Sequence, residues 1–294
     1  HHARAWLEGL QTLPEVSRLV RELFTKADRL AGTMPGIRRQ LRRQARVVQA
    51  PIAHLSIRAF GQATVSVGGK LLSVADWQTQ SVREFFFYLL TNPKPMTKEQ
   101  ISEALWQDVY EPAKLKLRFK NDIYRLRKAV GQEAILYKDM YYSFNRSIDY
   151  EYDVEAFESF ISKARSDEQP LQQIEHYQKA VDLVSGPYLN DIYADWNLHD
   201  RERLSQMHLS ALAALGNLYQ ANAEFDNALT VCQQAILFDS AFETAYQISM
   251  QVYHRLGDQV SIKRTHKACV DAMQQRFGMP PSPEVEELYR RLTR

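Results

Sequence analysis

The feature that most constrains the fold is an internal repeat of 34 residues in the C-terminal half of this 294-residue chain. The recurring positions are Leu212, Tyr219, Ala235 and Asp239, which return as Tyr246, Tyr253, Cys269 and Met273. This period, with tyrosine and small residues at these places, is typical of tetratricopeptide repeats, in which paired helices bury a face only by stacking on neighbours. The sequence therefore predicts a tetratricopeptide-like α-helical repeat domain over residues 149–294.

Amphipathic segments on both sides of the repeat extend this domain. We expect earlier helices over residues 153–166 and 171–184 and a closing helix over residues 284–292. Four conspicuous side chains in this half are expected to pack in the core rather than to form a binding site; they are Trp196, His208, Tyr219 and Tyr253. The two cysteines, Cys232 and Cys269, are expected to be buried, reduced thiols.

Upstream of the repeat the pattern changes to period two. The alternating apolar residues are Leu55, Ile57, Ala59, Ala63, Val65 and Val67. Two glycines, Gly68 and Gly69, follow them as a turn signal, which predicts a small antiparallel sheet.

Three helices and a hairpin follow this sheet. We expect a helix over residues 81–90, and a second helix that starts at Thr97, where Gln100 completes a capping box. A third helix spans residues 112–131, and a hairpin then turns at residues 138–140. This order predicts a winged helix-turn-helix domain over residues 51–148, in which the first two helices hold the third in a DNA groove. The predicted fold class is mostly α with a small antiparallel β component.

The third helix combines an apolar stripe with dense positive charge. Residues 112–131 contain seven Lys or Arg residues and one acid, Asp122. The apolar stripe consists of Phe119, Ile123, Leu126 and Val130, and the opposite side carries Lys114, Leu117, Arg118, Asn121, Arg125 and Lys128. Because Arg, Lys and Asn read base edges and a major groove admits a helix, this face suits DNA. A solvated basic helix on an ordinary domain is the alternative.

Several motifs resemble a known family. The segments LTNPKPMTKEQISEALW and NDIYRLRKAVG, with the hairpin after them, resemble the OmpR-type winged helix. Residues 55–294 more closely resemble SARP-type bacterial activators, through the segments YRLRKAVG (124–131), DVEAFE (153–158), SGPYL (185–189) and RFGMPPSPE (276–284). The chain departs from that family at the hairpin tip, which lacks the usual glycine and arginine, and at Leu117, where a polar residue is more usual.

The resemblance implies a winged helix followed by a bacterial transcriptional activation domain. It also implies that the protein binds repeated promoter half-sites and recruits RNA polymerase. A homodimer could occupy two such half-sites on DNA. In this family sensory or ATPase modules often lie upstream. Residues 1–50, with five arginines in residues 37–46, would then be a helical segment at the end of such a module.

Motifs of catalysis are missing from the sequence. It contains no phosphate-binding loop, no dinucleotide-binding glycine pattern, and none of the zinc-protease, paired-cysteine or nucleophile-elbow motifs. We therefore expect no enzyme, no cofactor and no metal site. No apolar run reaches 18 residues and no signal peptide is visible, so we expect a cytoplasmic protein without a membrane span. The acidic cluster Asp149, Glu151 and Asp153 is expected to be a solvated linker, with a cation site as the alternative.

Together these features predict a sequence-specific DNA-binding transcription activator whose partner is double-stranded DNA. The candidates for base contacts are Lys114, Arg118, Asn121, Tyr124, Arg125 and Lys128, with Asn121 for adenine and Arg125 for guanine. The candidates for phosphate contacts are Arg83, Thr97, Lys98, Lys120 and Lys138. The alternative is a protein-interaction scaffold in which the helical repeats bind a partner and the winged helix serves for docking or dimerisation.

Overall fold

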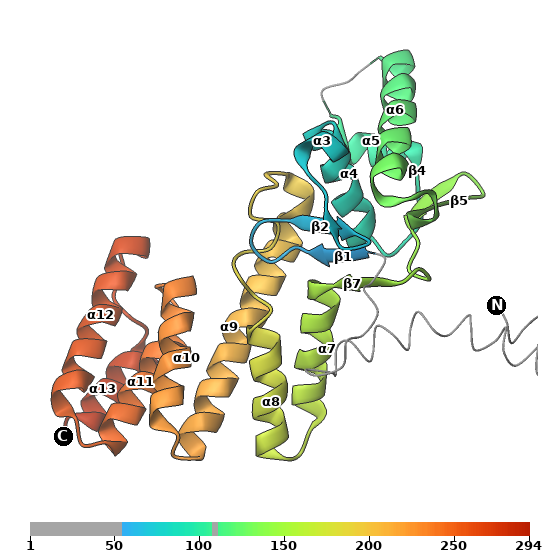
Figure 1. Cartoon of the computed structure of the whole chain (residues 1–294). Coiled ribbons are helices and arrows are strands. Elements are labelled where there is room, and N and C mark those ends of the chain that lie inside the picture. The colour runs from blue at the N-terminus through green and yellow to red at the C-terminus, as the bar shows by residue number, and fades with distance from the viewer. Residues whose placement is uncertain (1–54, 108–110) are drawn as a thin grey trace, which may run out of the picture. The chain divides into compact units, whose positions relative to one another are not determined.

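The computed structural model describes residues 55–107 and 111–294, and these residues form two compact units. Unit 1 contains Val65–Glu151 and the strand residues before Arg58. Unit 2 contains Arg58–Thr64 and Tyr152–Arg294 (Figure 1). The helical segment predicted over residues 1–50 lies outside the described residues.

Unit 1 has the predicted order of strands, three principal helices and a hairpin. Its strands are β1 (Leu55–Arg58), β2 (Thr64–Val67), β3 (Lys70–Leu71), β4 (Met96–Thr97), β5 (Ile135–Lys138), β6 (Tyr141–Phe144) and β7 (Tyr150–Tyr152). Its helices are α3 (Val74–Trp77), α4 (Gln80–Thr91), α5 (Lys98–Leu105), α6 (Pro112–Val130) and the 3-10 turn η1 (Gln132–Ala134). The fold class predicted from the sequence is confirmed in this unit.

The strands form two small sheets. One sheet has the order β3-β2-β1-β7 and the other has the order β4-β6-β5. Strands β2 and β3 are antiparallel and join through Gly68 and Gly69, which both have positive φ, as predicted for this turn. Strands β5 and β6 form the predicted hairpin, and its two turn residues, Asp139 and Met140, also have positive φ (52° and 70°).

Side-chain caps fix where the helices of unit 1 begin. The predicted capping box of α5 is confirmed: Gln100 N donates to the Thr97 hydroxyl, and Thr97 N donates to the Gln100 side chain. The hydroxyl of Thr79 accepts from Val82 N at the start of α4. The short helix α3 was not predicted.

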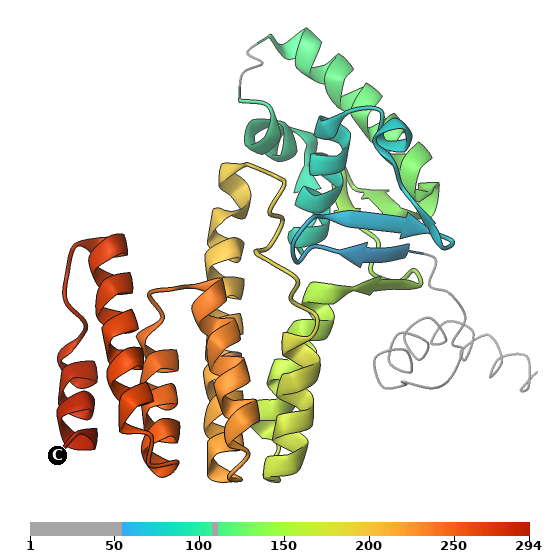
Figure 2. The ribbon, with the colours of Figure 1, turned by 60° about the vertical axis from the view of Figure 1, so that its left-hand side comes forward.

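Unit 2 is an array of paired helices. Its helices are α7 (Asp153–Ser166), α8 (Pro170–Val181), α9 (Leu198–Ala221), α10 (Phe225–Phe238), α11 (Glu243–Arg255), α12 (Gln259–Phe277) and α13 (Pro283–Leu292), with the 3-10 turn η2 (Asp195–Asn197) before α9. Consecutive helices lie side by side in both views, and neighbours from α7 to α12 pack on one another (Figures 1 and 2). The predicted helical repeat is confirmed.

The 34-residue period is visible in the backbone as well as in the sequence. The turn between α9 and α10 has Ala223 with φ of 61°, and the turn between α11 and α12 has Gly257 with φ of 73°. One residue later, Glu224 N donates to the Tyr219 carbonyl at 2.8 Å, and Asp258 N donates to the Tyr253 carbonyl at 2.9 Å. The two helical hairpins therefore share one turn geometry.

The side chains predicted to be core are buried or partly buried. His208 is buried against Phe238, with ring centroids 4.7 Å apart, and burial lowers its pKa to about 4. Cys232 and Cys269 are buried free thiols, and burial raises their pKa values to about 11 and about 12. Trp196, Tyr219 and Tyr253 are partly buried.

The prediction of a solvated acidic linker is wrong. Tyr150 and Tyr152 are buried in β7. The Asp153 carboxylate lies at the start of α7, where it accepts hydrogen bonds from the backbone N–H groups of Ala59 at 2.8 Å and Phe60 at 3.1 Å. Burial of this carboxyl raises its pKa from 3.8 to about 6, against the opposing effect of those hydrogen bonds.

This carboxylate also explains why the loop Arg58–Thr64 belongs to unit 2. It ties the loop Arg58–Thr64 to unit 2, as do hydrogen bonds from Gly61 N to the Pro187 carbonyl and from Ser185 Oγ to the Phe60 carbonyl. The limits predicted from the sequence, 51–148 and 149–294, place this loop in the N-terminal domain instead. Contacts over more than 90 residues of sequence decide its position.

Candidate nucleic-acid interface

The helix α6 is amphipathic in the predicted sense. It begins with Pro112 in its first turn and ends before Gly131, whose φ of 100° suits glycine. All four residues of the predicted apolar stripe are buried; they are Phe119, Ile123, Leu126 and Val130. Asp122 is buried with them, although it is the one acid of the helix. The burial of Asp122 was not predicted from the sequence.

Aromatic side chains fix the buried stripe of α6. The ring of Phe119 contacts Phe85 of α4, Trp106 at the end of α5, and Tyr142 of β6, with centroid distances of 5.6, 6.0 and 4.9 Å. Phe85 and Trp106 also contact each other edge to face. Because three different elements hold one ring, α6 cannot rotate about its axis without breaking this cluster.

The outer face of α6 presents most of the predicted base-contact candidates. Exposed side chains on this helix are Lys114, Asn121, Tyr124 and Lys128, together with the phosphate candidate Lys120. Tyr124 is 65% exposed and Leu117 is 59% exposed. Lys114 forms an exposed ion pair with Glu111 at 2.7 Å, which costs little to exchange for another anion.

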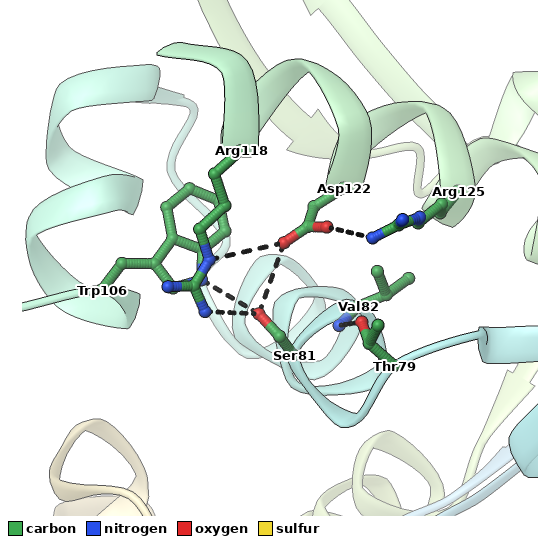
Figure 3. Close-up of polar contacts among 7 residues, drawn as sticks. All are labelled: Thr79, Ser81, Val82, Trp106, Arg118, Asp122 and Arg125. Atoms are coloured by element: carbon green, nitrogen blue, oxygen red, sulfur yellow. Dashed lines mark hydrogen bonds and ion pairs between the residues drawn. The ribbon is translucent and has the colours of Figure 1, made fainter. Parts of the chain in front are cut away.

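Arg118 and Arg125 are held differently from the other candidates. Both are only partly exposed, and both pair with the buried carboxylate of Asp122 (Figure 3). Arg125 Nη1 lies 3.3 Å from Asp122 Oδ1, and Arg118 Nε lies 3.9 Å from Asp122 Oδ2. One acid thus lies between the arginine one turn before it and the arginine one turn after it.

The hydroxyl of Ser81 on α4 joins this cluster. It accepts from the Trp106 indole Nε1–H at 3.0 Å and from Arg118 Nη2 at 3.4 Å, and it donates to Asp122 Oδ2 at 3.4 Å (Figure 3). The Arg118 guanidinium also lies over the Trp106 ring, 5.0 Å from its centroid. Ser81 and Asp122 were both missed from the sequence. Helical spacing gave no signal for them, because the residues three and four positions away from each are a mixture of apolar and polar side chains.

These residues border an open cavity of about 460 Å³ between α4 and α6. Its lining brings together four of the predicted base-contact candidates with residues near the start of α4; the lining residues are Thr79, Ser81, Lys114, Leu117, Arg118, Asn121, Asp122 and Arg125. The predicted candidates Tyr124 and Lys128 lie on α6 outside this cavity.

The five predicted phosphate candidates come from five elements, α4, β4, α5, α6 and β5. Thr97 and Lys138 both belong to the sheet β4-β6-β5, where each pairs with Tyr141, so the three residues form one row across the sheet. Lys98 follows Thr97 and pairs with Glu99 at 3.3 Å. Arg83 is half-buried on α4, with its guanidinium 5.9 Å from the Phe87 ring centroid.

The hairpin tip is more apolar than a phosphate contact needs. Lys138 is exposed there, but so are Tyr137, Met140 and Tyr141. The Tyr137 hydroxyl donates to the Met140 sulfur at 3.2 Å. Lys138 is therefore the one cation among the six exposed residues 136–141 of the hairpin, which also include the acid Asp139.

A family comparison decides the class of the C-terminal half. Residues 152–293 match the family described as the bacterial transcriptional activator domain. The C-terminal half is such an activator domain. The match begins one residue before α7 and ends one residue after α13, so it covers the whole helical array of the activator domain. The predicted resemblance to SARP-type activators, which contain such a domain, is confirmed over this region.

A solved structure supports the fold of both units. The structure of Mycobacterium tuberculosis EmbR in complex with a low affinity phosphopeptide is similar, with a TM-score of 0.67 and 15% sequence identity. The alignment covers 82% of this chain and 65% of the EmbR chain, so this chain spans about two thirds of that protein's length. No curated protein sequence gives a significant match to this chain.

Two further findings concern the described residues. Within residues 55–107 and 111–294, no helix has both the length and the apolar character to cross a bilayer. The same residues contain no cluster of three or more His, Cys, Asp or Glu side chains arranged to hold a metal ion.

Proposed function

We propose that this protein is a sequence-specific DNA-binding transcription activator in which α6 enters the major groove. The observation that carries the proposal is the helix itself. Its apolar stripe is fixed by an aromatic cluster, while the helix Pro112–Val130 carries six net positive charges and exposes its outer face. A helix presented in this way has the size, charge and donor groups that a major groove accepts.

The roles of individual residues follow from their exposure. Asn121 is exposed in the centre of α6 and has an amide that can pair with adenine in two hydrogen bonds. Arg125 lies one turn further on and has the planar fork that recognises guanine. Lys114, Tyr124 and Lys128 extend this face at its two ends, and Arg118 borders it.

Phosphate contacts are proposed for residues outside the centre of α6. Thr97 and Lys98 lie at the start of α5, the end of a helix whose dipole favours a negative charge. Lys138 lies in the same row of the sheet as Thr97 and would reach the backbone from the hairpin. Lys120 and Arg83 complete this set. Contacts of this kind fix the register on DNA without reading sequence.

The activator domain is proposed to recruit RNA polymerase. Its membership in the activator family supports this role. The repeated promoter sites and the homodimer on DNA remain part of the proposal, with the family resemblance as their support. The scaffold alternative uses the same helical array for a protein partner and leaves α6 without a nucleic-acid ligand.

A salt titration on double-stranded DNA tests the proposal. The wild-type chain should bind a random duplex at low salt, and log Kd should rise linearly with log salt concentration over about 50–200 mM, because bound phosphates release counterions. The number of phosphates follows from the slope, at about 0.9 per phosphate contact. Absence of duplex binding at low salt would favour the scaffold. A randomised duplex pool, selected in parallel, should yield a common sequence.

A further inference from the structure

We propose that Asp122 is a positioning residue that sets the sequence specificity of α6 by holding Arg118 and Arg125 against its carboxylate. This inference rests on the proposed function, because it concerns how the same helix distinguishes one duplex from another. Asp122 itself is not placed to touch DNA: its side chain is 5% exposed, whereas those of Arg118 and Arg125 are 34% and 36% exposed.

The geometry gives the carboxylate a supporting role. Its Oδ1 faces Arg125 and its Oδ2 faces Arg118 and Ser81, so both oxygens are occupied from within unit 1 (Figure 3). The acid lies beneath the two guanidinium groups, and these groups line the open cavity beside Asn121. Asp122 also contributes to the lining, but its small exposed area means that a base edge entering this cavity would meet mainly the two arginines.

Ser81 keeps the carboxylate in place from the other side. Its hydroxyl receives the indole N–H of Trp106, and Trp106 is buried in the aromatic cluster. The Ser81 hydroxyl therefore has its own position fixed by α5 before it meets Asp122 on α6. The Asp122 side chain is therefore held in one position. Its ion pairs with Arg118 and Arg125 favour the arginine conformations in which the guanidinium groups stay near the cavity.

Pairing affects specific and non-specific binding in opposite directions. An arginine whose conformation is already restricted loses less freedom when it reads a base, so the correct sequence is bound more tightly. The same carboxylate lowers the charge of α6 from +7 to +6 and keeps two guanidinium groups from reaching arbitrary phosphates. Asp122 should therefore raise affinity for the right duplex and lower affinity for all others.

The test compares Asp122→Asn with wild type on two probes. One is the duplex that the wild-type chain selects from a randomised pool, and the other is a scrambled duplex of the same composition. The variant should bind the selected duplex about 5- to 50-fold more weakly, in the range expected for loss of one well-placed base contact. It should bind the scrambled duplex about two- to threefold more tightly at low salt, because α6 gains one unit of positive charge.

A charge-matched variant separates positioning from net charge. Glu103→Gln removes one negative charge from an exposed position on α5 of the same unit. It should change both affinities by the same small factor and leave their ratio unaltered. If Asp122→Asn behaves like Glu103→Gln, the acid acts through charge alone and the inference is wrong. If it weakens both duplexes equally, the residue is merely structural and the inference is also wrong.

Two further variants sharpen the test, and the first of them keeps it valid if Asp122→Asn folds poorly, which circular dichroism would show. Ser81→Ala keeps every charge and should reduce the ratio of the two affinities without strengthening binding to the scrambled duplex. Asp122→Asn in an Arg125→Ala background should cause no further loss of preference at the base pair that Arg125→Ala relaxes. Additive losses in that double variant would overturn the inference. A wild-type chain that binds neither duplex would instead refute the proposed function.

Discussion

The helix α6 and the helical hairpins of unit 2 bury their apolar faces in different ways. Around α6 the core is made of large rings from unrelated elements, with Phe85, Trp106 and Phe119 in mutual contact. In the repeats the core positions include Ala228, Ala235, Ala245 and Gly216, where helices approach closely. Repeated helices present similar surfaces to one another and can pack closely through small residues. The helix α6 instead contacts elements of different shape, and large side chains fill the space between them.

The two regions also differ in surface charge. Pro112–Val130 carries seven Lys or Arg residues, whereas residues 204–254, which include most of α9, all of α10 and most of α11, carry none. A core can be built with either surface, so packing does not require the charge of α6. The cationic face is therefore a specialised feature of unit 1, which suits a polyanion, whereas residues 204–254 of the repeats carry only acids, namely Glu224, Asp226, Asp239 and Glu243.

Phe85→Ala should have the largest effect. Phe85 is fully buried and contacts two rings of the α6 cluster, so its truncation should cost about 3–5 kcal/mol of unfolding free energy and abolish duplex binding. Urea denaturation followed by circular dichroism measures the loss. The matched variant Leu212→Ala truncates a fully buried residue of α9. It should cost about 2–5 kcal/mol but leave duplex affinity unchanged while the protein is folded. Equal loss of duplex affinity in both variants would contradict the assignment of the DNA face to unit 1.

Arg125→Ala should have the next largest effect, and it should be local. It should cost about 1–3 kcal/mol of binding free energy at one base position and little on a random duplex.

Lys138→Ala should weaken binding to all sequences alike and reduce the salt slope by about one. Fluorescence anisotropy on a set of single-base variants of the selected duplex measures both. Equal losses on specific and random duplexes for both variants would refute this division of roles.

Asp153→Asn sharpens a comparison between two buried acids. Asp122 in α6 has arginine partners, whereas Asp153 is held mainly by backbone N–H groups. The pKa of Asp153 is about 6 in the folded protein and 3.8 when unperturbed, so the folded state binds more protons between these values. Its contribution to stability should therefore fall by roughly 1–2 kcal/mol as pH rises from about 4 to about 6.

Urea denaturation at several pH values checks this contribution. The stability difference between wild type and Asp153→Asn should be larger near pH 4 than near pH 6.5, because the variant cannot titrate at this position. A difference that stays constant over this range, or that grows with pH, would show that the hydrogen bonds from Ala59 and Phe60 outweigh burial.

Gly216→Ala should have the smallest effect, in the stabilising direction. A Cβ added at Gly216 would lie 3.4 Å from Cys232 Sγ and 3.5 Å from Val231 Cγ2, distances that α9 and α10 can accommodate with little movement. Alanine in a helix interior is favoured over glycine by about 0.5–1 kcal/mol. Gly216→Leu, by contrast, should lose about 1–3 kcal/mol through overpacking. Thermal unfolding of the two variants would show whether the helices of unit 2 are as closely packed as described.

Much of the architecture follows from sequence patterns. The 34-residue period, the stripe of α6, the capping box at Thr97 and the hairpin at Asp139 were all predicted, because each depends on residues close together in the chain or on a regular spacing. The DNA contacts of the candidate residues remain predictions. For these candidates the sequence supplies the residue type and the helical face. This information is enough to place Asn121 and Lys128 on the exposed side of α6.

Only the tertiary structure decided the environment of the buried acids. Asp122 meets Ser81 across 41 residues of sequence, and Asp153 meets Ala59 across 94. Helical period shows which side of a helix is apolar, but it does not show which distant polar group will satisfy a carboxylate on that side. Burial of a charge is favourable only when such partners are present, and partners are brought together by the fold as a whole.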